Sequence, residues 1–359
     1  MNYRISLVII SFLLSIFTGI YIAKYGGNNL SNNPEKNLKD PNKKPLIGFS
    51  MDTIKEARWQ KDKELFTNWL EKHDAKVVVQ SANSDDTRQI QDIQSMITMG
   101  VDVLVIVPHN GDAMSKAIEL AHKANIPVIS YDRIIKNSDL DLYITFDNKK
   151  VGELQAKFIA DNLPKNNLPV NIVRLYGSKT DNNAFMFKEG QDVVINELVK
   201  ENKVKVVHED WATDWKPEEA KRIMNAALTK FGHNIFAVLS SNDGMAGGAI
   251  QALIEEKIAG KLLVTGQDAD LTACQRIVSG TQAMTIYKPI KTLAEKSAEV
   301  ALEMAKRKPI IAKATVNNGS KEVPSILLEV VSVTKDNMKD TVVKDRFLDE
   351  DKVYSVTKK

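Results

Sequence analysis

The sequence has almost no cysteine: Cys274 is the single residue of this type among 359 residues. One thiol excludes an intramolecular disulfide and any metal site built from several cysteines of one chain. We predict that Cys274 is a small buried apolar residue. The five histidines are dispersed along the chain and form no metal-binding motif. We therefore expect neither a metal nor a cofactor.

Neither sign of charge is in large excess. The 49 Lys and Arg residues against 46 Asp and Glu residues give a net charge of +3, and the basic residues are scattered. A nucleic-acid surface needs clustered basic residues, so we expect no nucleic-acid partner. The hydrophobic fraction of 43% is typical of a globular protein, and the length favours two domains.

Motifs of common enzyme sites are also missing. The chain contains no GxSxG, no HExxH, no Walker A motif and no GxGxxG after a predicted strand. Residues 177–180 resemble the end of a phosphate-binding loop but lack its first glycine. Asp268 and Asp270 could form a carboxylate pair for glycoside hydrolysis, but nothing marks either as the acid. We predict that the protein is not an enzyme.

A long uncharged run occurs only near the amino terminus. Residues 5–23 are a run of 19 uncharged residues between Arg4 and Lys24. A helix of this length spans ~28 Å at ~1.5 Å per residue, close to the thickness of a bilayer core. A cleaved signal peptide is the alternative, but Tyr21 would place a bulky side chain at position −3. A lipoprotein signal would need a cysteine at the end of the apolar run, and none is present. We predict an uncleaved single-pass membrane anchor in residues 1–25, with the folded part outside the cell.

The segment after the predicted anchor has a different composition. Residues 26–45 are rich in Asn, Lys, Pro and Gly and contain few apolar side chains. This composition is typical of a flexible linker.

Short apolar runs alternate with helical patterns from residue 46 onward, which predicts an α/β fold with parallel sheets. The pattern restarts after residues 143–146, which suggests two doubly wound units. A strongly periodic helix covers residues 290–308, and a last strand covers 326–333 before a charged tail at 348–359. The other predicted strands are 46–51, 76–80, 101–107, 128–131, 170–175, 204–208, 235–239, 262–265 and 283–287.

Polar and aromatic side chains follow seven of these strands. Ligands of open α/β sheets bind outside the carboxyl ends of the strands, so these side chains would meet in one crevice. Planar polar groups pair with neighbouring hydroxyls and indole rings stack on apolar C–H faces, so the set suits a sugar. The side chains after the strands include Arg58, Trp59, Asp132, Arg133, Asp181, Asn182, Asn183, Trp211, Trp215, Asn242, Asp243, Gln267, Asp268 and Lys288.

Each of these residues also has a structural interpretation. An Asn or Asp after a strand is commonly a turn former or a helix N-cap, and Asn242 before a glycine-rich helix fits that role. Arg58 and Lys288 could be solvated, and Trp59 could belong to the core. Trp211 and Trp215 share a polar segment, so we expect one of them to provide a stacking surface.

Longer motifs in these segments resemble the bacterial D-xylose-binding proteins, which belong to the ribose/galactose-type periplasmic sugar-binding proteins. The similarity runs from about residue 46 to 347. Its motifs are EARWQKD at 56–62, VQSAN at 79–83, GVDVLVI at 100–106, YDR at 131–133, FDN at 146–148, VGELQAK at 151–157, SND at 241–243, AGGAIQAL at 246–253, GQDADL at 266–271 and YKP at 287–289.

This resemblance implies a periplasmic-binding-protein type I fold, with two doubly wound parallel-sheet domains joined by a three-segment hinge. The amino-terminal lobe would comprise residues 46–148 and 288–316, and the carboxy-terminal lobe 149–287 and 317–347. The hinge crossings would lie near Asn148, Lys288 and Asn317. The sugar contacts carried over from the family are Arg58, Trp59, Asp132, Arg133, Asn183, Trp215, Asn242, Asp268 and Lys288.

The predicted anchor distinguishes this chain from diffusible relatives. We expect a membrane-anchored extracellular D-xylose receptor that closes on the sugar and signals to a sensor histidine kinase of a two-component system. The alternative is the substrate-binding subunit of an ABC-type xylose importer, whose partner would be an ABC permease. A sugar-responsive repressor would need a helix-turn-helix amino terminus, which the apolar residues 5–23 do not provide.

Overall fold

The computed structural model describes residues 44–357. The predicted membrane anchor and nearly all of the predicted linker lie outside the described residues. Among residues 44–357, no helix is both long enough and apolar enough to cross a membrane.

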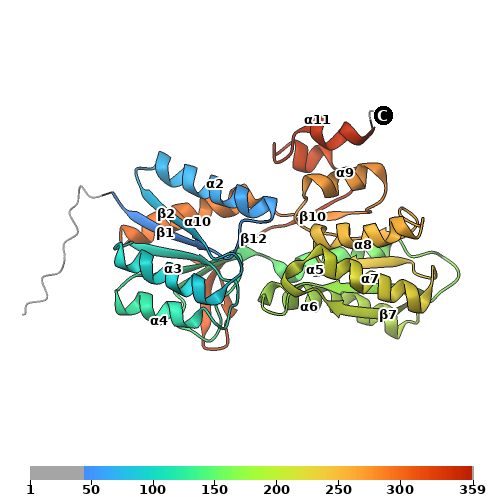
Figure 1. Ribbon diagram of the computed structural model, residues 1–359, viewed down its shortest axis with the longest axis horizontal. Coiled ribbons are helices and arrows are strands. Elements are labelled where there is room, and N and C mark those ends of the chain that lie inside the picture. The colour runs from blue at the N-terminus through green and yellow to red at the C-terminus, as the bar shows by residue number, and fades with distance from the viewer. Residues whose placement is uncertain (1–43, 358–359) are drawn as a thin grey trace, which may run out of the picture. The chain divides into compact units, whose positions relative to one another are not determined.

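A seven-stranded sheet forms the framework of the first half of the fold, in the order β11-β12-β5-β4-β3-β1-β2 (Figure 1). Every strand pair in it is parallel except the β11–β12 hairpin at the edge. Its central strands are apolar on both faces because helices cover both faces. The strands are β1 (Leu46–Met51), β2 (Lys76–Ser81), β3 (Val103–Val107), β4 (Val128–Tyr131), β5 (Leu142–Phe146), β11 (Ala314–Asn317) and β12 (Glu322–Leu328).

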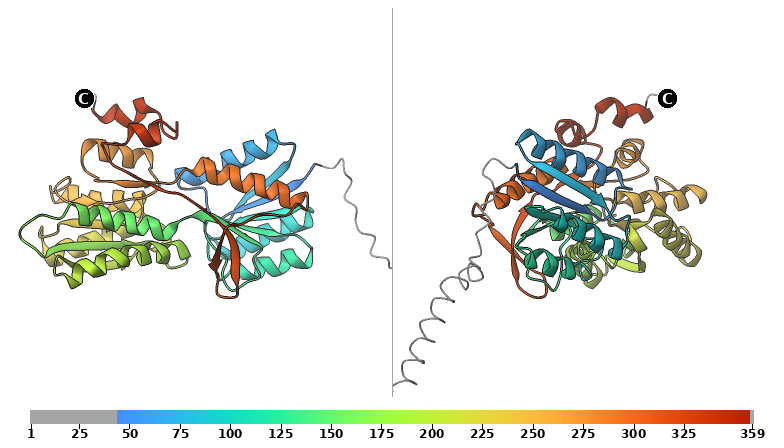
Figure 2. Two further views of the ribbon diagram at one scale, coloured as in Figure 1. Left: turned by 180° about the vertical axis from the view of Figure 1, so that it is seen from behind. Right: turned by 60° about the vertical axis from the view of Figure 1, so that its left-hand side comes forward.

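Two helix pairs cover this sheet, and Figure 2 shows them on opposite faces. One face packs against α2 and α10, where Phe66 and Leu293 join a core with Ile47. The other face packs against α3 and α4, where Ile93 and Ile118 join Leu104. We call this sheet with its helices the large-sheet lobe. The helices are α2 (Ala57–Lys72), α3 (Asp86–Thr98), α4 (Ser115–Lys123) and α10 (Ile290–Ala305).

A four-stranded parallel sheet, in the order β7-β6-β8-β9, forms the framework of the second half. Helices α5 and α6 pack on one face and α7 and α8 on the other. We call this sheet with its helices the small-sheet lobe. Its elements are β6 (Val170–Tyr176), β7 (Val204–Trp211), β8 (Ala237–Ser240), β9 (Leu263–Val264), α5 (Asn148–Asp161), α6 (Asn182–Lys200), α7 (Pro217–Phe231), α8 (Asp243–Glu255) and α9 (Leu271–Ser279).

The chain passes between the lobes at three places. It leaves β5 for α5 at 147–148, and it leaves β10 (Thr285–Tyr287) for α10 at 288–289. The third passage joins β12 to β13 (Val331–Val333), which pairs with β10 in a separate antiparallel ribbon. Figure 2, seen from behind, shows this segment running from β12 toward α9. The extent of each domain stays a prediction, apart from the boundary at 317.

The expected boundary at 317 is wrong. Strand β12 pairs in parallel with β5, from Ser325 opposite Tyr143 to Leu328 opposite Phe146, so residues up to 328 belong to the large sheet. The predicted strand 326–333 is correspondingly two strands in two different sheets. The run is apolar except for Glu329 and Ser332, and the single charge at Glu329 did not reveal the change of sheet, because the residues on both sides of it pack against apolar neighbours.

The predicted charged tail is folded for most of its length. Helix α11 (Glu350–Val353) packs against α9, and the buried Val353 joins Cys274 and Ile277 in one apolar cluster. The Gln275 side-chain amide donates to the backbone carbonyl of Lys352 at 2.9 Å. Cys274 is fully buried, as predicted. The short helical turns are η2 (Thr213–Trp215), η3 (Lys339–Val343) and η4 (Tyr354–Thr357).

Candidate functional site

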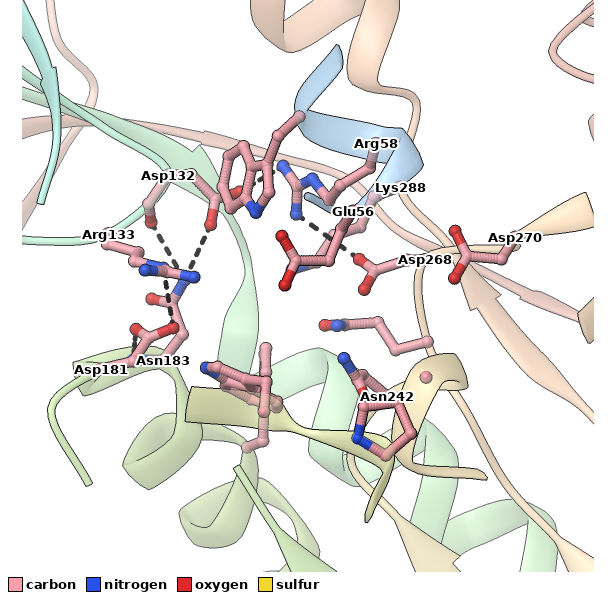
Figure 3. Close-up of a pocket in the computed structure, with 16 residues that line it drawn as sticks. Glu56, Arg58, Asp132, Arg133, Asp181, Asn183, Asn242, Asp268, Asp270 and Lys288 are labelled. Atoms are coloured by element: carbon pink, nitrogen blue, oxygen red, sulfur yellow. Dashed lines mark hydrogen bonds and ion pairs between the residues drawn. The ribbon is translucent and has the colours of Figure 1, made fainter. Parts of the chain in front are cut away.

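A pocket between the two lobes collects all nine predicted site residues (Figure 3). Its cavity volume is about 100 Å³. One buried water needs ~10–15 Å³ on the same measure, so the pocket has room for a small polar ligand. Sixteen residues line it, which leaves seven beyond the nine: Glu56, Asp181, Phe187, Pro217, Gly244, Gln267 and Asp270. That any of them contacts a ligand stays a prediction.

Arg58 is the centre of a buried ion-pair network. The first turn of α2 carries it, and its guanidinium donates to Asp62 at 3.2 Å, Asp132 at 2.8 Å and Asp268 at 3.4 Å. Burial alone would lower the pKa of Arg58, but the carboxylates of Asp132, Asp62 and Asp268 raise it well above its usual value. Asp268 belongs to the small-sheet lobe, so this arginine links the two lobes.

Arg133 makes a second link between the lobes. Its Nη1 donates to Asp52 of the large-sheet lobe at 2.7 Å, and its Nε forms an ion pair with Asp181 of the small-sheet lobe at 2.9 Å. Asp52 also pairs with His109 at 3.0 Å. The side chain of Arg133 therefore has a carboxylate on each side of the cleft.

Asp132 follows β4 and is held from all sides. Its backbone carbonyl accepts from the hydroxyls of Tyr143 at 2.8 Å and Thr145 at 2.7 Å. Its carboxylate accepts from Arg58 and, at 2.9 Å, from the Asn183 amide at the start of α6. Burial would raise the pKa of Asp132, but Arg58 and Lys288 outweigh burial and lower it. Asp132 is therefore a fixed, ionised hydrogen-bond acceptor.

Lys288 lies at the passage from β10 to α10 and is only 1% exposed. Its ammonium sits over the rings of Phe146 and Phe187, 5.5 and 5.0 Å from their centroids. Within residues 44–357 it makes no hydrogen bond or ion pair that satisfies the charge directly. Burial lowers the pKa of Lys288, and the attraction of Asp132 and Asp268 compensates only in part. A ligand oxygen in the pocket would supply the missing partner.

Two indole rings bound the pocket. Trp59 stacks beneath both arginines, with the guanidinium carbons of Arg58 and Arg133 at 4.2 and 5.2 Å from its ring. Trp215 comes from the opposite lobe and lies against Gly177, where a Cβ would stand 2.0 Å from its ring. Trp211 packs on Tyr176 and Phe185 instead and does not line this pocket.

Asn242 and Asp268 complete the set on the small-sheet lobe. Asn242 is both a pocket residue and the N-cap of α8, because its side chain accepts from the Met245 amide at 2.9 Å. Asn242 can therefore serve as a helix cap and still face the pocket, as both interpretations of its position predicted. The neighbouring Asp243 does not line the pocket; it is buried and accepts from Gln282 at 2.8 Å and Thr285 at 2.9 Å.

Two buried polar atoms at the pocket have no hydrogen-bond partner within the described part of the chain. These are the Trp215 indole nitrogen, a donor, and the Gln267 side-chain oxygen, an acceptor. An unpaired buried polar group costs ~1–3 kcal/mol. A ligand that carries hydroxyl groups can serve both, because a hydroxyl donates and accepts.

Three pocket residues have positive φ angles: Asp132 at 62°, Trp215 at 58° and Asp268 at 99°. Residues other than glycine rarely adopt positive φ angles, and each instance costs of order 1–3 kcal/mol. Surrounding contacts must offset this cost, and four hydrogen bonds hold Asp132 in its conformation. Such residues cluster at ligand sites.

Three of the seven further lining residues, Asp181, Gln267 and Asp270, are recognisable in the sequence near strand ends, although they are not among the predicted sugar contacts. Asp181 was visible beside Asn183 as a strand-end residue, and it caps α6 by accepting from the Asn183 amide at 2.9 Å. Gln267 and Asp270 likewise flank Asp268. Glu56, Phe187, Pro217 and Gly244 lie on or beside helices, where no pattern in the chain separates them from ordinary surface or core positions.

Comparisons with known proteins identify the family and the fold of this chain. Residues 47–309 match the periplasmic binding protein domain family. The D-xylose-binding periplasmic protein of Haemophilus influenzae is 49% identical over 86% of this chain and 92% of its own length. The D-xylose-binding periplasmic protein of Escherichia coli is 47% identical over 85% of this chain and 91% of its own length. The D-glucose complex of a carbohydrate transporter solute-binding protein from Chloroflexus aurantiacus superposes with a TM-score of 0.81, at 28% identity, covering 86% of this chain and 98% of that one.

The chain belongs to the ribose/galactose-type family of periplasmic sugar-binding proteins and has their type I α/β fold. Both predictions are confirmed. Membership also makes it a binding protein rather than an enzyme, as the absence of catalytic motifs indicated.

Proposed function

We propose that this chain is a D-xylose-binding protein whose two lobes close on one sugar molecule. The main observation is the convergence of two arginines, a buried lysine, carboxylates and two indole rings from both lobes on one small pocket. The Trp215 donor, the Gln267 acceptor and the Lys288 ammonium have no hydrogen-bond partner among residues 44–357, and a ligand rich in hydroxyl groups would supply one to each. The two relatives with nearly half of their residues identical carry D-xylose in their names.

The sugar would stabilise the closed arrangement because the contacts come from both lobes. Trp59, Asp132 and Arg133 lie on the large-sheet lobe, whereas Asn242 and Asp268 lie on the small-sheet lobe. Only a closed cleft brings both groups to one ligand. A ligand shifts a conformational equilibrium by its difference in affinity for the two states, so binding and closure are coupled.

Calorimetric titration with D-xylose, D-glucose, D-ribose and L-arabinose tests this proposal. We expect micromolar or tighter binding of D-xylose. Asp268→Ala should abolish it, because the substitution removes an acceptor from a buried network and leaves Arg58 with one carboxylate fewer. No heat with D-xylose, together with a signal for another sugar, would contradict the assignment.

The partner protein is the finer part of the proposal. The relative from Chloroflexus is described as part of a carbohydrate transporter, which favours the role of substrate-binding subunit of an ABC-type importer. Stimulation of a permease's ATPase by the xylose-loaded protein supports this role.

The uncharged segment 5–23 favours a second candidate, a membrane-anchored extracellular receptor for a sensor histidine kinase of a two-component system. Xylose-dependent association with a kinase's sensor region distinguishes the two. Equal association with and without xylose would contradict a signalling role.

A further inference from the structure

The acidic side chains of the pocket outnumber its basic ones. Five carboxylate residues and three cations line it, and the carboxylates are Glu56, Asp132, Asp181, Asp268 and Asp270. The arginines are already neutralised: Arg58 contacts three carboxylates and Arg133 two. Recognition of an anionic ligand commonly uses a free arginine fork, which these contacts occupy.

Glu56 and Asp270 differ from the other three acids. Neither carboxylate makes a hydrogen bond or ion pair with any residue of the range 44–357. Glu56 precedes α2 in the large-sheet lobe, and Asp270 precedes α9 in the small-sheet lobe. Figure 3 shows both carboxylates turned toward the pocket, Asp270 from the side of Asp268. Each lobe thus contributes to the cavity one carboxyl group that has no hydrogen-bond or ion-pair partner among residues 44–357.

The electrostatics of Asp270 agree with this geometry. The pKa of Asp270 is raised to about 7, chiefly by burial and then by the neighbouring Asp268, with a smaller contribution from Glu56. Arg276 and Arg58 oppose the shift without cancelling it. Above about pH 7 Asp270 is ionised, and an anionic ligand that enters this side of the pocket then meets the same unfavourable potential as its carboxylate.

We propose that Glu56 and Asp270 determine the charge selectivity of the site, so that it accepts neutral sugars and rejects sugars that carry a carboxylate. This inference rests on the proposed sugar-binding function and assigns a role to two residues outside the nine predicted contacts. Charged groups across a binding site select partners chiefly by penalising a like charge.

D-Glucuronate is a suitable probe because it is D-xylose with a carboxylate added at C5, and D-glucose carries an uncharged hydroxymethyl group at the same carbon. The experiment compares D-xylose, D-glucose and D-glucuronate by calorimetry or by competition with xylose. The proteins are the wild type, Glu56→Gln, Asp270→Asn and the double variant. The control is Glu64→Gln with Glu71→Gln, which changes the net charge equally on the exposed face of α2.

We expect the double variant to narrow the preference for xylose over glucuronate by roughly tenfold or more, equivalent to about 1.4 kcal/mol, through a gain in glucuronate affinity. The control should leave the preference unchanged. Raising the salt concentration should weaken the discrimination in the wild type, because salt screens the repulsion.

Three results would overturn the inference: tight glucuronate binding by the wild type, no gain of glucuronate binding in the double variant, or equal rejection of glucose and glucuronate. The last would assign the selectivity to size. Absence of xylose binding in the wild type would instead contradict the proposed function, so the two failures are distinguishable.

Discussion

Replacing Lys288 by Met should strengthen the fold and weaken sugar binding at once. Lys288 is 1% exposed, and its ammonium lies over two aromatic rings without a hydrogen bond or ion pair to any residue of the range 44–357. A buried donor without a partner costs ~1–3 kcal/mol, and more when it is charged. The lowered pKa of Lys288 shows that burial outweighs the attraction of Asp132 and Asp268. Methionine has a similar length and no charge, so it removes this cost and keeps the packing.

The same substitution removes a charged donor from the pocket. A hydrogen bond to a charged group contributes ~1.5–3 kcal/mol, which corresponds to a roughly 10- to 150-fold weaker affinity for xylose. Thermal melts without sugar should show Tm a few degrees higher, as expected for about 1–3 kcal/mol in a protein of this size. The rise in Tm that xylose causes in the wild type should shrink.

Thermal melts with and without xylose, together with calorimetric titration, measure both effects. Lys291→Met is the matched control: the Lys291 side chain is 67% exposed on α10, so its charge carries little of the cost of burial. It should change neither Tm nor affinity appreciably. A Lys288→Met protein that melts lower than the wild type, or that binds xylose within threefold of it, would refute the reasoning.

Two further predictions follow from the pocket. The raised pKa of Asp270, about 7, means that the folded protein holds a proton that the unfolded chain releases near pH 4, so this group lowers stability as pH rises from about 4 to 7. Asp270→Asn should therefore raise Tm at pH 8 and leave it nearly unchanged at pH 4; an equal shift at both pH values would contradict this linkage. Gly177→Ala places a Cβ 2.0 Å from the Trp215 ring, so we expect about 1–3 kcal/mol of destabilisation in denaturant titrations and weaker xylose binding. Unchanged stability and affinity would show that Trp215 moves aside without cost.

The extent to which sequence predicts this molecule depends on how local each feature is. The buried strands β1 and β3 are recognisable because short, mainly apolar runs are typical of strands covered on both faces: all five residues of β3 are apolar, and Ser50 is the one polar side chain of β1. The change of sheet between β12 and β13 is not, because it depends on pairing with β5 and β10, which are distant in sequence.

The site shows the same division. Asp132 and Arg133 are visible at the end of an apolar run, and their neighbours at other strand ends fall in the same crevice. Sequence cannot show that Arg58 is paired with three carboxylates, or that Lys288 is paired with none in the described part of the chain. The distinction between a neutralised and an unsatisfied charge depends on distances across two lobes, and it is this distinction that separates a structural cation from a ligand contact.

The links between the lobes also bear on how binding is coupled to closure. Arg58–Asp268 and Arg133–Asp181 are ion pairs across the cleft, and each of these arginines keeps a carboxylate of its own lobe as well, Asp132 for Arg58. Opening the cleft therefore removes one of the carboxylate partners of each arginine. Water can replace that partner in the open cleft, and ion pairs at an exposed surface contribute little to stability. The ion pairs alone give the closed form a modest advantage. A sugar that satisfies Lys288 and the Trp215 indole adds contacts that exist only when both lobes meet, and so supplies the differential affinity that closure requires.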